Sequence, residues 1–279
     1  MLRLPFMGLS PDLAKLIKAG LDGEHQSEVD AIREYLPNFI IIGAAKSATT
    51  TLTTILPRHP DFFISKPKEP KFFGRYYSKG WSWYAKIFKA GKDKAFRGEG
   101  STMYASRLGS FHHTPALMKR YIPDLKIIYI VRHPLDRLVS QWRHVKGRQA
   151  NCGDFDQLMR SNHLRRLVVG CSLYYQQLER FKNSFPDSQI YCLTFEDLIS
   201  EPRPTLKGLL NFLGAAPKVG KLLDAGELPR VNEAGDKGRD LVPKPEWPSG
   251  LRRRVVRLIQ PDSERLLAYM KKPADYWKF

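Results

Sequence analysis

The chain has 279 residues, and its 46 lysines and arginines outnumber 28 aspartates and glutamates to give a formal net charge of +18. Such a charge favours anionic partners, namely nucleotides, sulfated or uronic sugars, nucleic acid or acidic membranes, without choosing among them. Three cysteines, an odd number without close paired spacing, argue against a disulfide framework or a zinc site, and no metal is expected. No stretch approaches the roughly 18 apolar residues of a membrane span, and the N-terminus lacks the apolar core of a signal peptide, so we expect a soluble, cytoplasmic chain.

The N-terminal part is expected to be a peripheral helical extension over residues 1–37, followed by a single domain over residues 38–279. Apolar residues recur at helical spacing in the extension. Ser27 with Asp30 resembles the N-cap signal of a second short helix. The pattern leaves open whether these helices pack on the domain or form an interaction arm.

The first strand candidate, residues 39–42, leads into a turn of small residues that contains Lys46 and a block of hydroxyls. Helical spacing begins at Leu52, so the order is strand, lysine turn, helix. A helix N-terminus offers unpaired N–H groups to a phosphate, and Lys46 adds a full charge. The turn is not the nucleoside-triphosphatase loop, because Lys46 comes three residues after Gly43 and no glycine precedes it. The alternative is an ordinary strand-to-helix turn with a solvated lysine.

Two further continuous apolar runs, residues 127–131 and 190–193, predict strands that are buried on both faces of a parallel sheet. Helical patterns cover residues 135–145, 174–185, 205–213 and 251–270. This alternation predicts an α/β fold with a central, mostly parallel sheet flanked by helices. Ligands of such sheets bind beyond the carboxyl ends of the strands, so Lys46 and Arg132 are expected at one edge.

A second anion anchor is predicted at Arg132, which ends a strand, and Ser140, which lies eight residues later in the following helix. Arg132 can donate two hydrogen bonds to a phosphate, and Ser140 adds a hydroxyl. The alternative is that Arg132 pairs with Asp136 at the start of the helix.

Together the two anchors resemble the cofactor site of sulfotransferases that use 3′-phosphoadenosine 5′-phosphosulfate (PAPS). The family's first motif, Gly-x-x-Lys-Ser/Thr-Gly-Thr-Thr/Ser-x-Leu, is matched from Gly43 to Leu52 except at Ala48, where glycine is usual. The turn must therefore avoid a left-handed conformation at Ala48 or be slightly strained. The second motif, Arg-x-Pro-x-x-Arg-x-x-Ser, is matched fully from Arg132 to Ser140. The resemblance implies a fold like that of the P-loop nucleoside triphosphatases.

Supporting segments are similar to those of the heparan sulfate and related carbohydrate sulfotransferases. Residues 68–73 look like Lys-Glu-x-x-Phe-Phe, although Lys71 stands where a histidine is common. Residues 98–104 resemble Gly-Glu-Lys-Thr-Pro-x-Tyr, with Gly100 in place of the lysine. Residues 237–239 resemble the Lys-Gly-Arg loop that closes over the cofactor phosphates.

The resemblance implies in-line transfer of a sulfuryl group from PAPS to a hydroxyl or amine, with adenosine 3′,5′-bisphosphate as the other product. The acceptor is expected to be a small molecule or glycan, most simply a carbohydrate or glycolipid, and an acidic one would suit the basic chain. Lys46 would stabilise the leaving phosphate oxygen. The cofactor-binding residues are expected to be Lys46, Ser47, Ala48, Thr49, Thr50, Thr51, Arg132, Ser140, Lys237, Gly238 and Arg239.

Glu69 is the expected catalytic base, because it matches the family's catalytic glutamate; the alternative is a surface ion-pair partner. Lys71 at the usual histidine position argues against a Glu–His relay. His112 and His113 are rival bases, since a cytosolic-type sulfotransferase would use a histidine near this point. Four aromatic residues could line an acceptor pocket or belong to the core: Trp81, Trp83, Tyr84 and Tyr104.

The sequence leaves two other functions open. A nucleotide kinase or nucleoside triphosphatase of the P-loop type is disfavoured by the loop spacing and by the lack of a clear magnesium-binding aspartate at a strand end. A basic, non-enzymatic protein that binds anionic glycans would show steep salt dependence and no nucleotide site. Nucleic acid is the less favoured partner.

Overall fold

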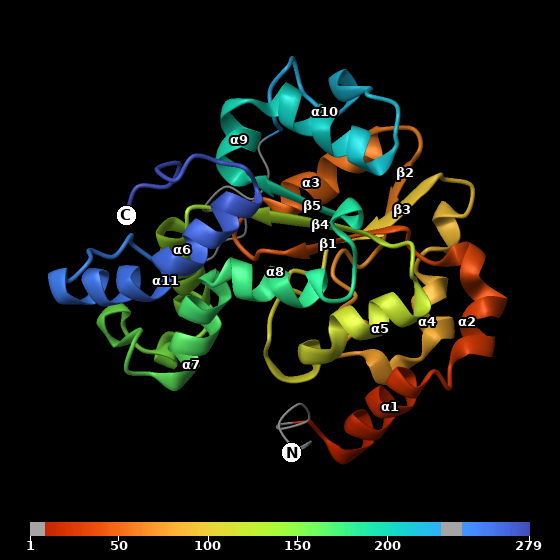
Figure 1. Ribbon diagram of the computed structural model, residues 1–279, viewed down its shortest axis with the longest axis horizontal. Coiled ribbons are helices and arrows are strands. Elements are labelled where there is room, and N and C mark those ends of the chain that lie inside the picture. The colour runs from red at the N-terminus through yellow and green to blue at the C-terminus, as the bar shows by residue number, and fades with distance from the viewer. Residues whose placement is uncertain (1–8, 230–241) are drawn as a thin grey trace.

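The computed structural model describes residues 9–229 and 242–279. Within these residues a single sheet contains five parallel strands in the order β2-β3-β1-β4-β5 (Figure 1). The strands are β1 (Phe39–Gly43), β2 (Phe62–Ile64), β3 (Phe96–Glu99), β4 (Lys126–Val131) and β5 (Ile190–Thr194). The predicted α/β class and parallel sheet are confirmed.

The three predicted strands correspond to β1, β4 and β5 and are confirmed, whereas β2 and β3 were not predicted. Strand β2 is only three residues long and lies at the edge of the sheet. Strand β3 contains Gly98, at which an added Cβ would lie 2.3 Å from ring atoms of Phe39. The strand therefore needs a glycine where the two strands meet, and its sequence does not read as an apolar run.

Helices cover both faces of the sheet, which explains the continuous apolar strands (Figure 1). One face packs against α3 (Thr49–Ile55), α9 (Phe195–Ser200) and α10 (Pro202–Leu213). The other face packs against α4 (Trp81–Lys86), α5 (Thr114–Tyr121) and α8 (Tyr174–Lys182). Within β1, Ile40 and Ile42 pack on the face covered by α4, α5 and α8, and Ile41 packs on the opposite face.

The N-terminal helices are α1 (Pro11–Asp22) and α2 (Gln26–Ile32). Ile17 and Val29 are fully buried in the same core as the sheet residues, so both helices pack on the domain. The predicted N-cap at Ser27 is wrong. Gly23 ends α1 in a left-handed conformation with φ of 92°, and α2 starts at Gln26, so Ser27 already lies in its first turn.

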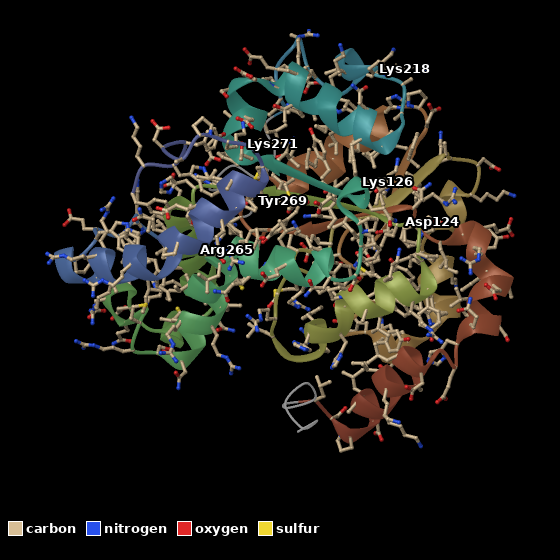
Figure 2. All side chains as sticks on the ribbon, in the orientation of Figure 1. Asp124, Lys126, Lys218, Arg265, Tyr269 and Lys271 are labelled. Carbon is tan, nitrogen blue, oxygen red and sulfur yellow. The ribbon has the colours of Figure 1, made fainter. Side chains whose placement is uncertain are left out.

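A third hydrophobic cluster joins α6 (Pro134–Lys146) to α11 (Ser249–Tyr269) and to the short α7 (Asn162–Leu164). Arg265 and Tyr269 connect α11 to α8 (Figure 2). Arg265 pairs with Glu179 of α8 at 3.0 Å, and the Lys182 ammonium of α8 lies 3.9 Å from the Tyr269 ring centroid. The predicted helices α6, α8, α10 and α11 are thus confirmed. None of the helices that the structure describes combines the length and apolar character needed to cross a bilayer.

Candidate functional site

The lysine turn, residues 44–48, lies at the carboxyl edge of the sheet between β1 and α3. It is tied to β4, because the Ala44 N–H donates to the Ile130 carbonyl at 2.6 Å. Ala48 adopts the left-handed conformation with φ of 63° and ψ of 21°, and Lys46 has φ of 71°. Of the two possibilities that the sequence left at Ala48, the strained one is therefore present.

Ser47 presents a buried hydroxyl inside this turn. The residue is 0% exposed, and its Oγ has no hydrogen-bond partner among the residues that the structure describes. Leaving a buried hydroxyl unpaired is unfavourable by about 1–3 kcal/mol. A ligand oxygen at this place would remove that penalty, so the turn fits an anion such as a phosphate.

Arg132 follows β4 at the same edge. Its Nε is buried without a hydrogen-bond partner within residues 9–229 and 242–279, and its guanidinium carbon lies 4.5 Å from the Phe195 ring centroid. The alternative ion pair with Asp136 is absent from the described part of the chain. Ser140 lies on α6, half-buried. The structure therefore brings both predicted anchors to one sheet edge.

The loop after Arg132 is held by two parts of the chain that the sequence did not link to it. The His133 N–H donates to Glu196 Oε1 at 2.8 Å, and Trp277 Nε1 donates to Glu196 Oε2 at 3.4 Å. A His133 ring nitrogen also lies 2.9 Å from the Lys278 carbonyl oxygen. Glu196 lies two residues after the end of β5 at Thr194.

Glu69 is half-buried and contacts both neighbouring lysines, with Lys68 Nζ at 3.6 Å and Lys71 Nζ at 3.4 Å. Thr102 Oγ1 donates to Glu69 Oε1 at 3.3 Å. Lys68 also donates to Thr50 Oγ1 at 2.9 Å. Lys68 thus links Glu69 to the helix that follows the lysine turn, a bridging role that the sequence analysis did not assign. The ion pairs of Glu69 with Lys68 and Lys71 are present, and its role as the catalytic base stays a prediction.

Glu99 is a fully buried carboxylate at the end of β3. It accepts hydrogen bonds from the hydroxyls of Tyr84 and Tyr104, both at 2.8 Å, and of Ser101 at 2.5 Å. Burial raises the pKa of Glu99 to about 7, and the three hydroxyls only partly oppose that effect. Tyr84 and Tyr104 are therefore core residues that serve this carboxylate.

The Glu99 cluster also holds the segment that carries Glu69. Ser101 Oγ accepts the Lys71 N–H at 2.9 Å, and the Tyr104 hydroxyl accepts the Phe73 N–H at 3.4 Å. The backbone N–H groups of Lys71 and Phe73 are thereby linked, through Ser101 and Tyr104, to Glu99 at the end of β3. Sequence reasoning missed this role, since the contacts join residues that are far apart in the chain.

The remaining predicted residues lie elsewhere or outside the description. Trp81 is 1% exposed in the core, and Trp83 packs against it partly buried. His112 and His113 lie in a short 3₁₀ segment before α5 and not in the segment of Glu69; burial and nearby arginines lower the pKa of His112. Residues 237–239 lie outside the described residues.

Comparisons with known proteins identify the family of the chain. The family model "Sulfotransferase domain" matches residues 36–228. The chain is 29% identical over 192 residues to human (Homo sapiens) heparan sulfate glucosamine 3-O-sulfotransferase 3A1, covering 67% of this chain and 46% of that protein. It is 26% identical over 253 residues to human heparan sulfate glucosamine 3-O-sulfotransferase 6, and this match covers 84% of this chain and 71% of that protein.

Among solved structures, a sulfotransferase from Alicyclobacillus acidocaldarius superposes with a TM-score of 0.68 at 23% identity. The alignment covers 87% of this chain and 98% of that one, so the two share a fold. The chain spans about half the length of the curated relatives that it matches first, 46% in each of two human cases.

Proposed function

Because the chain belongs to the sulfotransferase family, we propose that it moves a sulfuryl group from PAPS to a hydroxyl or amine of a carbohydrate or glycolipid acceptor. The observation that carries the proposal is a pair of buried polar atoms, Ser47 Oγ and Arg132 Nε, neither of which has a hydrogen-bond partner among the described residues. They lie at the carboxyl ends of the neighbouring parallel strands β1 and β4. A nucleotide with phosphates at two separate positions would satisfy both.

The lysine turn would hold the 5′-phosphosulfate. Lys46 supplies charge, and Ser47, Thr49, Thr50 and Thr51 supply hydroxyls, while Ala48 contributes its backbone at the start of α3. Arg132 and Ser140 would hold the 3′-phosphate, with two parallel donors and a hydroxyl. Bound PAPS supplies an activated sulfuryl group whose bond to phosphate is the one broken.

The chain's own residues then have three tasks. Lys46 stabilises the negative charge that builds on the leaving phosphate oxygen. Glu69 accepts the proton of the acceptor hydroxyl or amine as its oxygen or nitrogen bonds to sulfur. Lys68 keeps the Glu69 carboxylate near the turn, through its contacts to Thr50 and Glu69. Placement and charge account for the catalysis, as in phosphoryl transfer.

The test is sulfate transfer from labelled PAPS to a panel of glycans, glycolipids, phenols and sterols. Lys46→Ala should lower the rate by roughly 10²–10³-fold, the magnitude typical of losing one transition-state donor. The matched control is Lys92→Ala, which removes an exposed lysine far along the chain. Full activity of Lys46→Ala, or tighter binding of ATP–Mg²⁺ than of adenosine 3′,5′-bisphosphate, would contradict the proposal, the latter in favour of a kinase.

A further inference from the structure

The peptide unit between Arg132 and His133 is held at both of its polar groups. The Arg132 carbonyl accepts a hydrogen bond from the Tyr174 hydroxyl at 2.8 Å. The His133 N–H donates to Glu196 Oε1 at 2.8 Å. A trans peptide unit is planar, and its carbonyl and N–H point in opposite directions, so two such bonds leave it little freedom to rotate. The backbone that carries Arg132 is therefore set by Tyr174 of α8 and Glu196 of α9.

Trp277 contacts both of the residues that hold this peptide unit. It is 3% exposed and lies in residues 270–279, the segment that follows α11. Its Nε1 donates to Glu196 Oε2 at 3.4 Å, and its ring centroid lies 6.1 Å from that of Tyr174. Its ring centroid also lies 6.2 Å from that of His133. One buried tryptophan thus packs against both holders of the peptide unit and against the side chain of His133.

The neighbours of Trp277 in the chain fix it to the start of α9 (Figure 1). The Tyr276 hydroxyl donates to Asp197 Oδ1 at 2.7 Å. Lys272 Nζ donates to Asp197 Oδ2 at 2.5 Å. Hydrogen bonds to an ionised carboxylate are about twice as strong as those between neutral groups. The segment 270–279 is therefore held at Asp197, one residue beyond Glu196, and this contact places Trp277.

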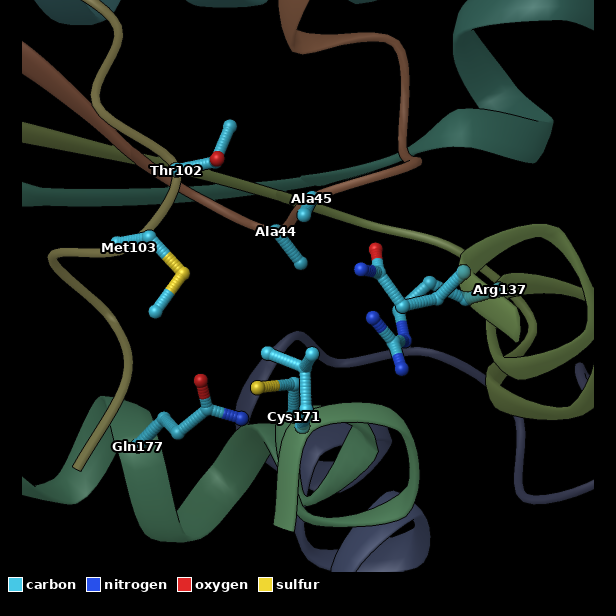
Figure 3. A pocket seen from close by; sticks show the side chains of 9 residues that line it. Ala44, Ala45, Thr102, Met103, Arg137, Cys171 and Gln177 are labelled. Atoms are coloured by element: carbon cyan, nitrogen blue, oxygen red, sulfur yellow. The ribbon is translucent and has the colours of Figure 1, made fainter. Parts of the chain in front are cut away.

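Different residues fix the helix that follows the peptide unit. Figure 3 shows the Arg137 side chain extending from α6 toward the segment that carries Cys171. Arg137 Nε donates to Ser172 Oγ at 2.8 Å, and Ser172 Oγ donates to the carbonyl of Pro134, the first residue of α6, at 3.4 Å. These contacts do not include Trp277. A substitution at Trp277 should therefore disturb the Arg132 peptide unit and leave the start of α6 in place.

The guanidinium of Arg132 depends on this backbone for its direction. Its carbon lies 4.5 Å from the Phe195 ring centroid. No carboxylate pairs with Arg132 within residues 9–229 and 242–279, so no ion pair with the protein orients it there. A bidentate contact needs two guanidinium N–H groups aimed at two phosphate oxygens at once. A small rotation of the Arg132 peptide unit would therefore weaken one of the two hydrogen bonds.

We propose that Trp277 is a positioning residue for the 3′-phosphate of the donor nucleotide. It packs on Tyr174 and Glu196, which fix the peptide unit from which Arg132 projects. The inference rests on the proposed function, since it treats Arg132 as the ligand of the 3′-phosphate. Such coupling is reciprocal: the factor by which docking of residues 270–279 raises the affinity for the 3′-phosphate is the factor by which that phosphate favours docking.

The first test compares calorimetric affinities for adenosine 3′,5′-bisphosphate and adenosine 5′-monophosphate, which differ only in the 3′-phosphate. Trp277→Phe keeps an aromatic ring and removes the donor to Glu196, and Tyr174→Phe removes the hydroxyl that reaches the Arg132 carbonyl. Each variant should lower the preference for the bisphosphate by about fivefold, the lower end of coupling between sites. The affinity for the monophosphate should stay within twofold, whereas a general loss of structure would weaken binding of both nucleotides alike.

The same substitutions at two other aromatic positions are the matched controls. Trp83→Phe changes a partly buried tryptophan of α4. Tyr129→Phe removes a buried hydroxyl that has no hydrogen-bond partner among the residues that the structure describes. Both variants should keep the nucleotide preference of the wild type.

Amide hydrogen exchange of the wild type supplies the reciprocal measurement and does not depend on the folding of a variant. At saturating concentrations, the bisphosphate should slow exchange in residues 270–279 more than the monophosphate does. An unchanged preference in either variant, or equal protection of this segment by the two nucleotides, would overturn the role of Trp277. Failure of the proposed function is recognised separately, as equal affinity of the wild type for the two nucleotides, which would also remove the 3′-phosphate site that the inference requires.

Discussion

The buried carboxylate of Glu99 makes a quantitative prediction about stability and pH. Its pKa is about 7 in the folded chain, against an ordinary value of 4.5. A difference of this size corresponds to about 3 kcal/mol. The folded state holds the proton of Glu99 more tightly than the unfolded state does. The contribution of this proton to the free energy of unfolding is therefore fully present below pH 4.5. It is lost as the pH rises toward about 7.

Glu99→Gln removes the titration while keeping the shape of the side chain. Relative to this variant, the wild-type free energy of unfolding should fall by about 3 kcal/mol between pH 4.5 and pH 7. Other titrating groups are common to both proteins, so they cancel in the difference. Urea unfolding followed by tryptophan fluorescence at several pH values supplies the data, provided that the two m-values agree.

The control is Glu246→Gln, which alters an exposed glutamate and should leave the pH dependence of the wild type unchanged. A difference between wild type and Glu99→Gln that stays constant over this pH range would refute the reasoning. It would mean that the three hydroxyls hold Glu99 ionised in the folded chain throughout.

Two further substitutions test the lysine turn. Ala48→Gly should raise the free energy of unfolding by about 1 kcal/mol, since glycine tolerates the left-handed conformation at φ of 63°; a loss of stability in urea unfolding would show that Ala48 is not strained. Ser47→Ala should stabilise the chain without nucleotide by about 1 kcal/mol, because it deletes a buried hydroxyl that has no hydrogen-bond partner in residues 9–229 and 242–279. The same variant should bind adenosine 3′,5′-bisphosphate about tenfold more weakly by calorimetry; unchanged affinity would remove Ser47 from the site.

The sequence predicted strands β1, β4 and β5 and missed the neighbouring strands β2 and β3, for a physical reason. Strands buried on both faces must be apolar throughout, so β1, β4 and β5 stand out as apolar runs. Strand β2 is too short for a pattern, and β3 combines a glycine required by Phe39 with the buried Glu99. Such residues are explained only by neighbours that the fold supplies.

The candidate site also combines residues that the sequence could place with contacts that it could not. The lysine turn and Arg132 could be placed at one edge because each directly follows a strand. The bridge from Lys68 to Thr50 and the tether from Glu99 to the Glu69 segment depend on contacts between separate elements. The spacing of residues along the chain carries no trace of those contacts. The predicted N-cap at Ser27 was wrong because the Ser27–Asp30 pattern does not take account of Gly23, which ends α1 just before α2 begins.

The central claim is that the two anchors together hold a nucleotide with phosphates at both the 5′ and 3′ positions. Calorimetric titration of the wild type and of Arg132→Ala with adenosine 3′,5′-bisphosphate and with adenosine 5′-monophosphate tests it directly. The wild type should bind the bisphosphate about 100-fold more tightly than the monophosphate, and Arg132→Ala should lose most of that difference, as expected for a bidentate charged contact. Equal affinity of the wild type for the two nucleotides would contradict the account.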